Sequence, residues 1–96
     1  MNSYDMNTIW QVSQKVLSSK IDEEVILMSI EADSYFGLDP IASHIWDLLS
    51  QKPATINELV QLLMEEYEVE YDVCRIDVQT LIDDMSARKL ISQVDK

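Results

Sequence analysis

Between Gln14 and Leu38, apolar positions recur with a period of about two, which is typical of β-strands. Lys15–Ile21 (KVLSSKI) is a short segment rich in β-formers, and Glu23–Ile30 is an apolar stretch. Ser34–Leu38 (SYFGL) is a third short strand. The polar segments between them are too short for crossover connections, so the strands must pair antiparallel. The sequence therefore predicts a three-stranded antiparallel sheet over residues 14–38, preceded by an N-terminal arm over residues 1–12.

Beyond the predicted sheet, the apolar spacing changes to about 3.6 residues, which indicates amphipathic helices. Asp39 can cap free backbone N–H groups, and Pro40 suits the first helical position. Thr55 and Glu58 stand at the spacing of a capping box and predict the start of a second helix. Asp72 is a candidate cap for a third helix.

The expected order is thus three strands followed by three helices, with the helical part over residues 40–91. This order predicts an α+β fold of the winged helix-turn-helix type. With 96 residues and neither a repeat nor a linker, the chain fits a single domain over residues 1–96.

The net charge of the chain limits the classes of molecule that it can bind. Eighteen acidic against seven basic residues give a formal net charge of −11. Such a chain repels phosphate backbones and anionic membranes, because both kinds of binding depend on Lys and Arg. We therefore expect neither nucleic acid nor a membrane as a partner. One cysteine, no signal-peptide pattern and no apolar run of membrane-spanning length make a cytoplasmic protein the simplest expectation.

Candidate chemistry is sparse. His44 is the only histidine and Cys74 the only cysteine, and neither has a partner at the sequence spacing of a metal site or a catalytic pair. The acidic run EEYEVEY lacks the residue order of a calcium loop. A phosphate-binding glycine loop is absent from the sequence as well. We therefore expect that the protein is not an enzyme, that it has no catalytic or metal-binding residues, and that it binds no cofactor.

A DNA-reading winged helix is the alternative that this element order leaves open. The third helix would then enter the groove of the duplex. Outside its apolar side, however, this helix offers Arg75 and Gln79 together with the three acids Asp77, Asp83 and Asp84. This set is poorly suited to contact phosphates, so DNA binding is the weaker interpretation.

The run VILMSIEADSYFGLDPIASHIWDLL resembles the PqqD-like family, whose members combine an apolar strand, a short glycine-bearing strand and a helix with an Ile-Trp pair. The similarity continues through TINELVQLLMEEYEV and DVQTLIDDMSARKLI and covers about Gln14 to Ile91. Two positions depart from the family pattern. Asp39 replaces the usual Asn and keeps its capping role, and Lys89 replaces the usual glycine at the exit of the last helix.

The resemblance implies a recognition element for ribosomally synthesised, post-translationally modified peptides (RiPPs). Such domains have a winged helix-turn-helix fold and bind the leader segment of a precursor peptide. In its tryptophan-bearing helix and its size, the chain most resembles the leader-binding proteins of lasso-peptide pathways, which work with a separate leader protease. The alternative within the family is the peptide chaperone of pyrroloquinoline quinone synthesis, whose partner is a radical enzyme.

A leader peptide could add as a further strand to an exposed sheet edge, and pockets between that edge and the third helix would select its side chains. The helical step of 100° places one stripe of the third helix beside its apolar side. Asp77 and Asp84 on that stripe could pair with basic leader residues, or they could be ordinary solvated acids. The candidate peptide-binding residues are Ser34, Tyr35, Phe36, Gly37, Leu38, Val73, Ile76, Asp77, Thr80, Leu81 and Asp84.

Overall fold

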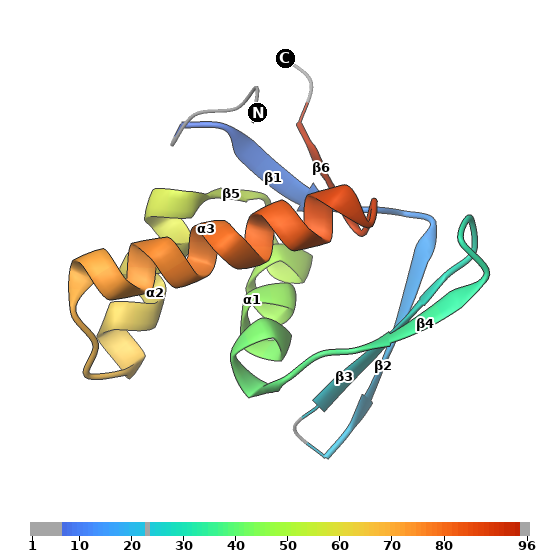
Figure 1. Cartoon of the computed structure of the whole chain (residues 1–96), viewed down its shortest axis with the longest axis horizontal. Helices are drawn as coiled ribbons and strands as arrows, with labels where there is room; N and C mark the ends of the chain where they lie inside the picture. The colour runs from blue at the N-terminus through green and yellow to red at the C-terminus, as the bar shows by residue number, and fades with distance from the viewer. Residues whose placement is uncertain (1–6, 23, 95–96) are drawn as a thin grey trace.

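Two small antiparallel sheets and three helices make up the fold. The computed structural model describes residues 7–22 and 24–94. Figure 1 shows the sheet β2-β3-β4 at one end of the molecule and α2 at the other, with α1 between them and α3 running from α2 toward the sheet. In chain order the elements are β1 (Ile9–Val12), β2 (Val16–Ile21), β3 (Glu24–Ser29), β4 (Ser34–Gly37), α1 (Pro40–Gln51), β5 (Ala54–Thr55), α2 (Ile56–Glu66), α3 (Tyr71–Ala87) and β6 (Ile91–Gln93).

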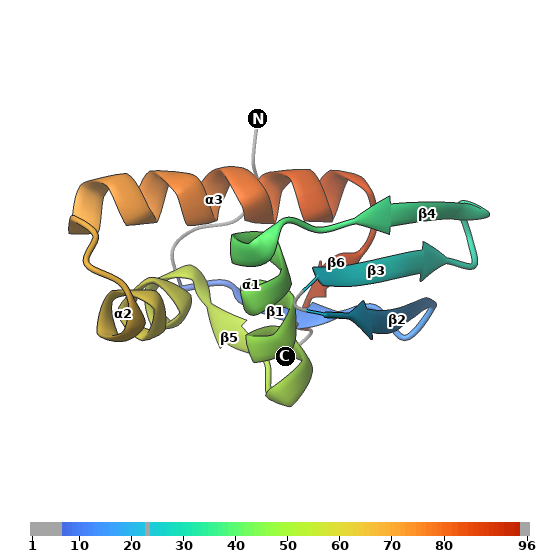
Figure 2. The same ribbon diagram turned by 90° about the horizontal axis from the view of Figure 1, so that it is seen from below.

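The predicted α+β class and the three-stranded meander are confirmed. Strands β2, β3 and β4 pair antiparallel in sequence order, with Leu27 opposite both Ser18 and Phe36. In Figure 2, β4 is the strand of this sheet that lies closest to α3. The three helices follow the sheet, an arrangement compatible with a winged helix-turn-helix.

The second sheet, in the order β5-β1-β6, was not predicted. The sequence analysis assigned residues 1–12 to an arm, yet their last four residues form β1, and Trp10 within it is 1% exposed. Residues 1–6 of the predicted arm lie outside the described residues. Strand β1 pairs with β5 and with β6, which lie more than forty residues away. Such distant partners leave no local periodicity for the sequence to reveal.

Both predicted helix starts at Asp39 and Thr55 are confirmed. Asp39 accepts a hydrogen bond from the Ala42 amide (2.8 Å), and Thr55 and Glu58 form a complete capping box. The third helix differs, because it begins at Tyr71 after Glu70, and Asp72 lies in its first turn. An acid in that position is still favourable, since it faces the positive end of the helix dipole.

The core lies where the helices meet the inner faces of both sheets. It joins the tryptophans of β1 and α1 to aliphatic side chains of all three helices: Trp10, Val25, Leu27, Ala42, Ile45, Trp46, Leu49, Ala54, Ile56, Leu59, Val60, Leu63, Cys74, Val78, Ile82, Met85, Leu90 and Ile91. Phe36, Leu38 and Leu81 pack against this core and remain partly exposed. These three residues therefore connect the core to the surface between β4 and α3. Among the described residues, no helix is both long and apolar enough to cross a membrane.

A buried hydroxyl fastens α1 to the sheet. Ser43, which is 2% exposed, accepts a hydrogen bond from the Val25 amide (2.9 Å) and donates one to the Leu38 carbonyl (3.1 Å). The Leu38 amide in turn donates to the Val25 carbonyl (2.9 Å). The hydroxyl thus replaces the second ladder bond of the Val25–Leu38 pair, where the end of β4 turns toward α1.

Helix α3 ends in a Schellman motif. The amides of Lys89 and Leu90 donate to the carbonyls of Ser86 (3.0 Å) and Met85 (2.9 Å), which satisfies the last turn of the helix. Lys89 adopts the left-handed conformation, with φ of 60°. This geometry explains why a glycine is usual here, since the Cβ of any other residue is strained in that region.

Replacing Lys89 with glycine should therefore stabilise the protein. We expect Lys89→Gly to raise the free energy of unfolding by about 1 kcal/mol, because the left-handed strain disappears. Thermal denaturation should show a midpoint about 4–8 °C higher. Lys89→Ala is the control, since it removes the same charge and keeps the strained Cβ. Equal midpoints for the two variants would contradict the explanation.

Replacing Ser43 with alanine should have the opposite effect. Ser43→Ala leaves the Val25 amide and the Leu38 carbonyl without a partner, and each such buried group costs about 1–3 kcal/mol. Chemical denaturation should show a loss of at least that amount. Ser50→Ala is the matched control, because the exposed Ser50 hydroxyl only donates to the Trp46 carbonyl of the same helix. A similar loss in both variants would show that the Ser43 link has no special role.

Candidate functional site

The open edge of β4 is the first component of the site. Residues along an antiparallel strand alternate between those whose N–H and C=O face the partner strand and those whose groups face away. Because the Leu38 amide bonds to β3, the backbone groups of Ser34 and Phe36 also face β3. The N–H and C=O groups of Tyr35 and Gly37 consequently point to the side of β4 that no described strand occupies. They form a short template for another strand.

The side chains of β4 also alternate. Phe36 and Leu38 turn toward the core, whereas Tyr35 lies on the opposite face and is 72% exposed. Gly37 shares the Tyr35 face, and a Cβ there would meet only the Cδ1 of Ile26 at 3.7 Å, an ordinary contact. Its φ is not positive, so its backbone is one that other residues can adopt. The edge is thus a normal extended strand with one large side chain beside its outward backbone groups.

A pocket of about 280 Å³ separates β4 from the end of α3, and we call it the edge pocket. Apolar side chains form part of its lining, and the Arg88 guanidinium lies over the Phe36 ring, 5.2 Å from the ring centroid. The same guanidinium donates to both carboxylate oxygens of Asp84 at 3.1 Å. The lining residues are Tyr35, Phe36, Gly37, Leu38, Leu81, Asp84, Met85, Arg88 and Leu90.

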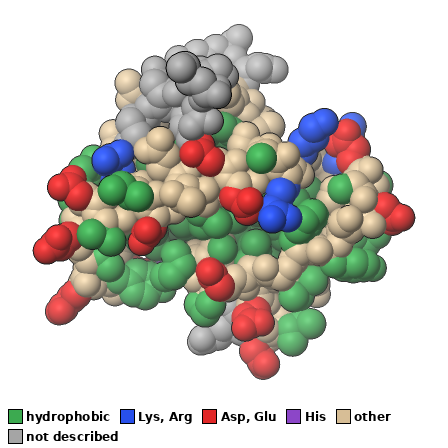
Figure 3. Space-filling view, in the orientation of Figure 1, with side chains coloured by type: hydrophobic (Ala, Val, Ile, Leu, Met, Phe, Trp, Pro, Cys, Tyr) green, Lys and Arg blue, Asp and Glu red, His purple; other side chains and the backbone are tan. Residues whose placement is uncertain are grey.

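A second pocket of about 530 Å³ continues along α3 toward the start of α1, and we call it the helix pocket. It is lined by Asp39, Ile41, Ala42, Asp77, Thr80, Leu81 and Asp84. Leu81 and Asp84 border both pockets, so the two form one depression, the β4–α3 groove. In the orientation of Figure 3, hydrophobic side chains gather in the hollow beside α3, with acidic and basic side chains along its rim.

Charge in the groove is mainly negative. Asp39, Asp77 and Asp84 contribute three carboxylates, against the single guanidinium of Arg88. Two of these carboxylates already have partners, since Asp39 caps α1 and Asp84 binds Arg88. The Asp84–Arg88 pair is about half-exposed, so its contribution to stability is small, at most about 1 kcal/mol. An occupant with a cationic side chain would meet a favourable field near Asp77.

The groove contains eight of the eleven residues that the sequence nominated. Tyr35, Phe36, Gly37, Leu38, Asp77, Thr80, Leu81 and Asp84 line one or both of its pockets. Ser34, Val73 and Ile76 line neither. Val73 and Ile76 lie nearer the start of α3 and are 52% and 54% exposed. The groove stops short of them at Asp77.

Sequence reasoning missed the residues that close the groove at both ends. Arg88 follows Asp84 by four positions, which places it on the same side of the helix, and this spacing could have identified it. Asp39 was recognised only as the cap of α1, and Ile41 and Ala42 follow it in the first turn of that helix. Their position beside the groove depends on the turn after β4 and carries no separate sequence signal.

The contacts of His44 and Cys74 are those of residues that support the fold. His44 Nε2 lies 3.0 Å from Glu66 Oε2, and its ring meets the Tyr67 ring edge-on at 6.0 Å, so it links α1 to the end of α2. Burial raises the pKa of the Cys74 thiol, and the nearby Asp77 carboxylate raises the pKa further. A raised pKa disfavours the reactive thiolate. The described residues include no group of three side chains arranged to hold a metal ion.

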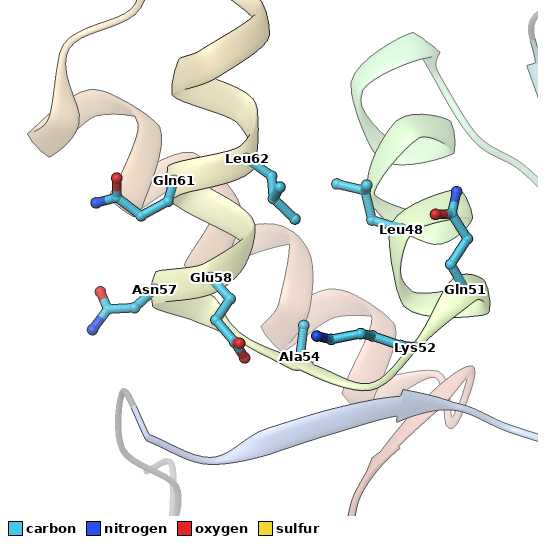
Figure 4. A pocket seen from close by; sticks show the side chains of 8 residues that line it. All are labelled: Leu48, Gln51, Lys52, Ala54, Asn57, Glu58, Gln61 and Leu62. Atoms are coloured by element: carbon cyan, nitrogen blue, oxygen red, sulfur yellow. The ribbon is translucent and has the colours of Figure 1, made fainter.

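A larger cavity lies elsewhere, between α1 and α2. It has a volume of about 650 Å³ and is lined by Leu48, Gln51, Lys52, Ala54, Asn57, Glu58, Gln61 and Leu62. Figure 4 shows Leu48 and Leu62 pointing toward each other across it. None of the nominated residues lines this cavity. The strand that contributes to its lining is the two-residue β5, which already pairs with β1 and so offers no open edge to a peptide. We therefore place the candidate site in the β4–α3 groove.

Comparison with solved structures identifies two similar proteins. The structure of TbiB1 in complex with the TbiA(beta) leader peptide is 29% identical in sequence, with a TM-score of 0.82. The match covers 90% of this chain and 99% of that one. A lasso peptide synthetase B1 complexed with its leader peptide is 19% identical, with a TM-score of 0.76 and coverage of 86% and 96%, and this likeness shows a shared fold.

Comparison with curated protein sequences gives no significant match. Residues 24–91 match the family described as coenzyme PQQ synthesis protein D (PqqD). This range runs from the start of β3 to the start of β6 and includes the whole β4–α3 groove. The chain belongs to the PqqD family.

Proposed function

We propose that this protein binds the leader segment of a ribosomally synthesised precursor peptide and delivers it to a processing enzyme. The observation that carries the proposal is the open edge of β4, whose outward backbone groups border the β4–α3 groove. A protein with a similar fold and 29% sequence identity has been solved in complex with a leader peptide, which supports the same class of ligand here.

Strand addition accounts for both affinity and selectivity at this edge. Tyr35 and Gly37 offer two N–H donors and two C=O acceptors to an extended peptide. Each main-chain hydrogen bond contributes about 0.5–1.5 kcal/mol, whatever the sequence of the peptide. Alternate side chains of the added strand would point toward the groove, where the apolar floor around Leu81 favours apolar leader residues. Asp77 would favour a basic neighbour.

In this proposal the protein is an adaptor and performs no chemistry itself. The buried thiol of Cys74, whose pKa is raised, and the contact of His44 with Glu66 support this assignment. The preferred partner is a separate leader protease of a lasso-peptide pathway, acting with this chain in the cytoplasm. The alternative partner is an enzyme of another pathway, such as pyrroloquinoline quinone synthesis, which the description of the family supports. DNA reading has no comparable support, because the exposed side of α3 carries Asp77 and Asp84.

Leader and core fragments of the precursor test the proposal directly. The precursor would be taken from the reading frame next to the gene for this protein. Fluorescence anisotropy should show that the leader fragment binds and that the core fragment contributes little. Equal binding of both fragments would contradict leader recognition.

Proline at position 35 should weaken leader binding while leaving the fold intact. The Tyr35 amide faces away from β3, so Tyr35→Pro removes no ladder bond of the free protein, and edge strands tolerate such a proline. The loss of one donor to the leader should reduce affinity roughly two- to tenfold in an anisotropy titration.

Tyr35→Ala is the matched control, because it removes the same side chain and keeps the amide. We expect Tyr35→Pro to bind the leader more weakly than Tyr35→Ala, with thermal midpoints within a few degrees of each other. If the two variants bind equally well, the Tyr35 amide makes no bond to the leader and the pairing scheme is wrong.

A further inference from the structure

The sheet β2-β3-β4 has a second, outward face that the leader groove does not use. The strand register places Leu17, Met28 and Tyr35 side by side across the three strands. Because side chains alternate along a strand, Ile26 and Ile21 lie on this same face. Ile30, whose amide bonds to the Lys15 carbonyl, continues the row beyond the end of β3. We call Leu17, Ile21, Ile26, Met28, Ile30 and Tyr35 the outer apolar face.

This face is largely exposed. Leu17, Ile21, Ile30 and Tyr35 are 57%, 62%, 57% and 72% exposed. Val25 and Leu27, which point to the other face, are almost fully buried against α1 and the core. Figures 1 and 2 show the described helices on the core side of the sheet only. An antiparallel sheet with one solvated face normally alternates apolar and polar residues, so apolar residues on both faces indicate a binding partner.

Acidic residues border the outer apolar face at both ends. Asp22 directly follows β2 and Glu24 is the first residue of β3, while Glu31 and Asp33 lie at the turn between β3 and β4. Lys20 points to the opposite face, where its Nζ lies 3.0 Å from Asp47 Oδ2. A second copy of this chain packed face to face would bring acids to acids at these borders. A partner with basic residues around an apolar centre would complement the face.

We propose that the outer apolar face is the docking surface for the processing enzyme, which would present apolar side chains bordered by Lys or Arg. This inference rests on the proposed function, since it identifies where the enzyme meets the leader-loaded protein. The face meets the groove only at Tyr35 on the edge strand, and its other five residues line neither pocket of the groove, so an enzyme on this face leaves the groove free. The acids at the border would mainly accelerate association, and the apolar centre would supply the affinity.

The leader would extend this face. A strand added to β4 continues the sheet, and every second side chain of that strand lies on the outer face beside Tyr35 and Gly37. Because Gly37 has no side chain, nothing projects from the outer face at this position of β4. The enzyme could therefore contact Tyr35 and the added leader strand at the same time. The enzyme should therefore bind the leader-loaded protein more tightly than the free protein. Such a surface would let the enzyme distinguish a loaded adaptor from an empty one.

Leu17→Lys is the decisive variant. Leu17 lies on β2 and is separated from the leader edge by β3 and β4, so leader affinity should remain within about twofold of the parent. A lysine in the apolar centre would place an unpaired charge in the interface and should weaken enzyme binding by about tenfold or more. Ser18→Lys is the matched control, because this exposed neighbour points to the other face.

The experiment has two independent measurements. Anisotropy with labelled leader peptide tests the groove, and biolayer interferometry with the purified enzyme that cleaves or modifies the precursor tests the outer apolar face. We expect Leu17→Lys to bind leader normally and enzyme poorly, Ser18→Lys to bind both normally, and the parent to bind enzyme more tightly with leader present. Failure of the parent to bind leader would refute the proposed function itself.

Two results would overturn the docking surface while leaving leader binding intact. One is enzyme binding by Leu17→Lys that equals the parent's, with and without leader. The other is a dimer of the parent in analytical ultracentrifugation that Leu17→Lys dissociates, which would show that a second copy occupies this face.

Discussion

The hydroxyl of Ser43 joins three elements at one point, and the shape of the functional surface depends on it. On one side it accepts from the amide of Val25 in β3, and on the other it donates to the carbonyl of Leu38, just after β4. In a regular ladder the Val25 amide would donate directly to the Leu38 carbonyl. The serine instead lets β4 turn away from β3 into α1 without leaving a buried backbone group unpaired. The Asp39 cap then starts α1 directly after the turn.

The groove follows from this geometry. Because α1 starts at the end of β4, its first residues close one end of the depression, and Arg88 at the end of α3 closes the other. The apolar floor belongs to the core, since Phe36, Leu38 and Leu81 pack against buried residues. A ligand that enters would therefore meet a surface that is already fixed, which lowers the entropic cost of binding. The outward backbone groups of Tyr35 and Gly37 are then available to pair with the ligand.

Local signals in the sequence were sufficient for much of this fold. The caps at Asp39 and Thr55 depend on neighbouring residues alone, and both appear where the sequence placed them. The edge strand Ser34–Leu38 was recognised to within one residue, because the change of period after it is sharp. Along α3, the helical step correctly placed Asp77, Thr80 and Asp84 on one side.

Features that depend on tertiary contact were not predictable in this way. Strand β1 pairs with segments more than forty residues away, so Trp10 gave no sign of its burial. The helical step could not show where along α3 the groove ends, and Val73 and Ile76 were therefore included although they lie beyond it. The outer apolar face became visible only through the register, since exposure cannot be derived from alternation when both faces of a strand are apolar.

Amide hydrogen exchange with and without leader peptide, resolved by residue in NMR spectra, tests the central claim most directly. Strand addition at β4 predicts that the amides of Tyr35 and Gly37 become strongly protected when the leader binds. The amides of Phe36 and Leu38, which already face β3, should change little. Leader binding that leaves Tyr35 and Gly37 unprotected, or that protects all four amides alike, would contradict strand addition at this edge.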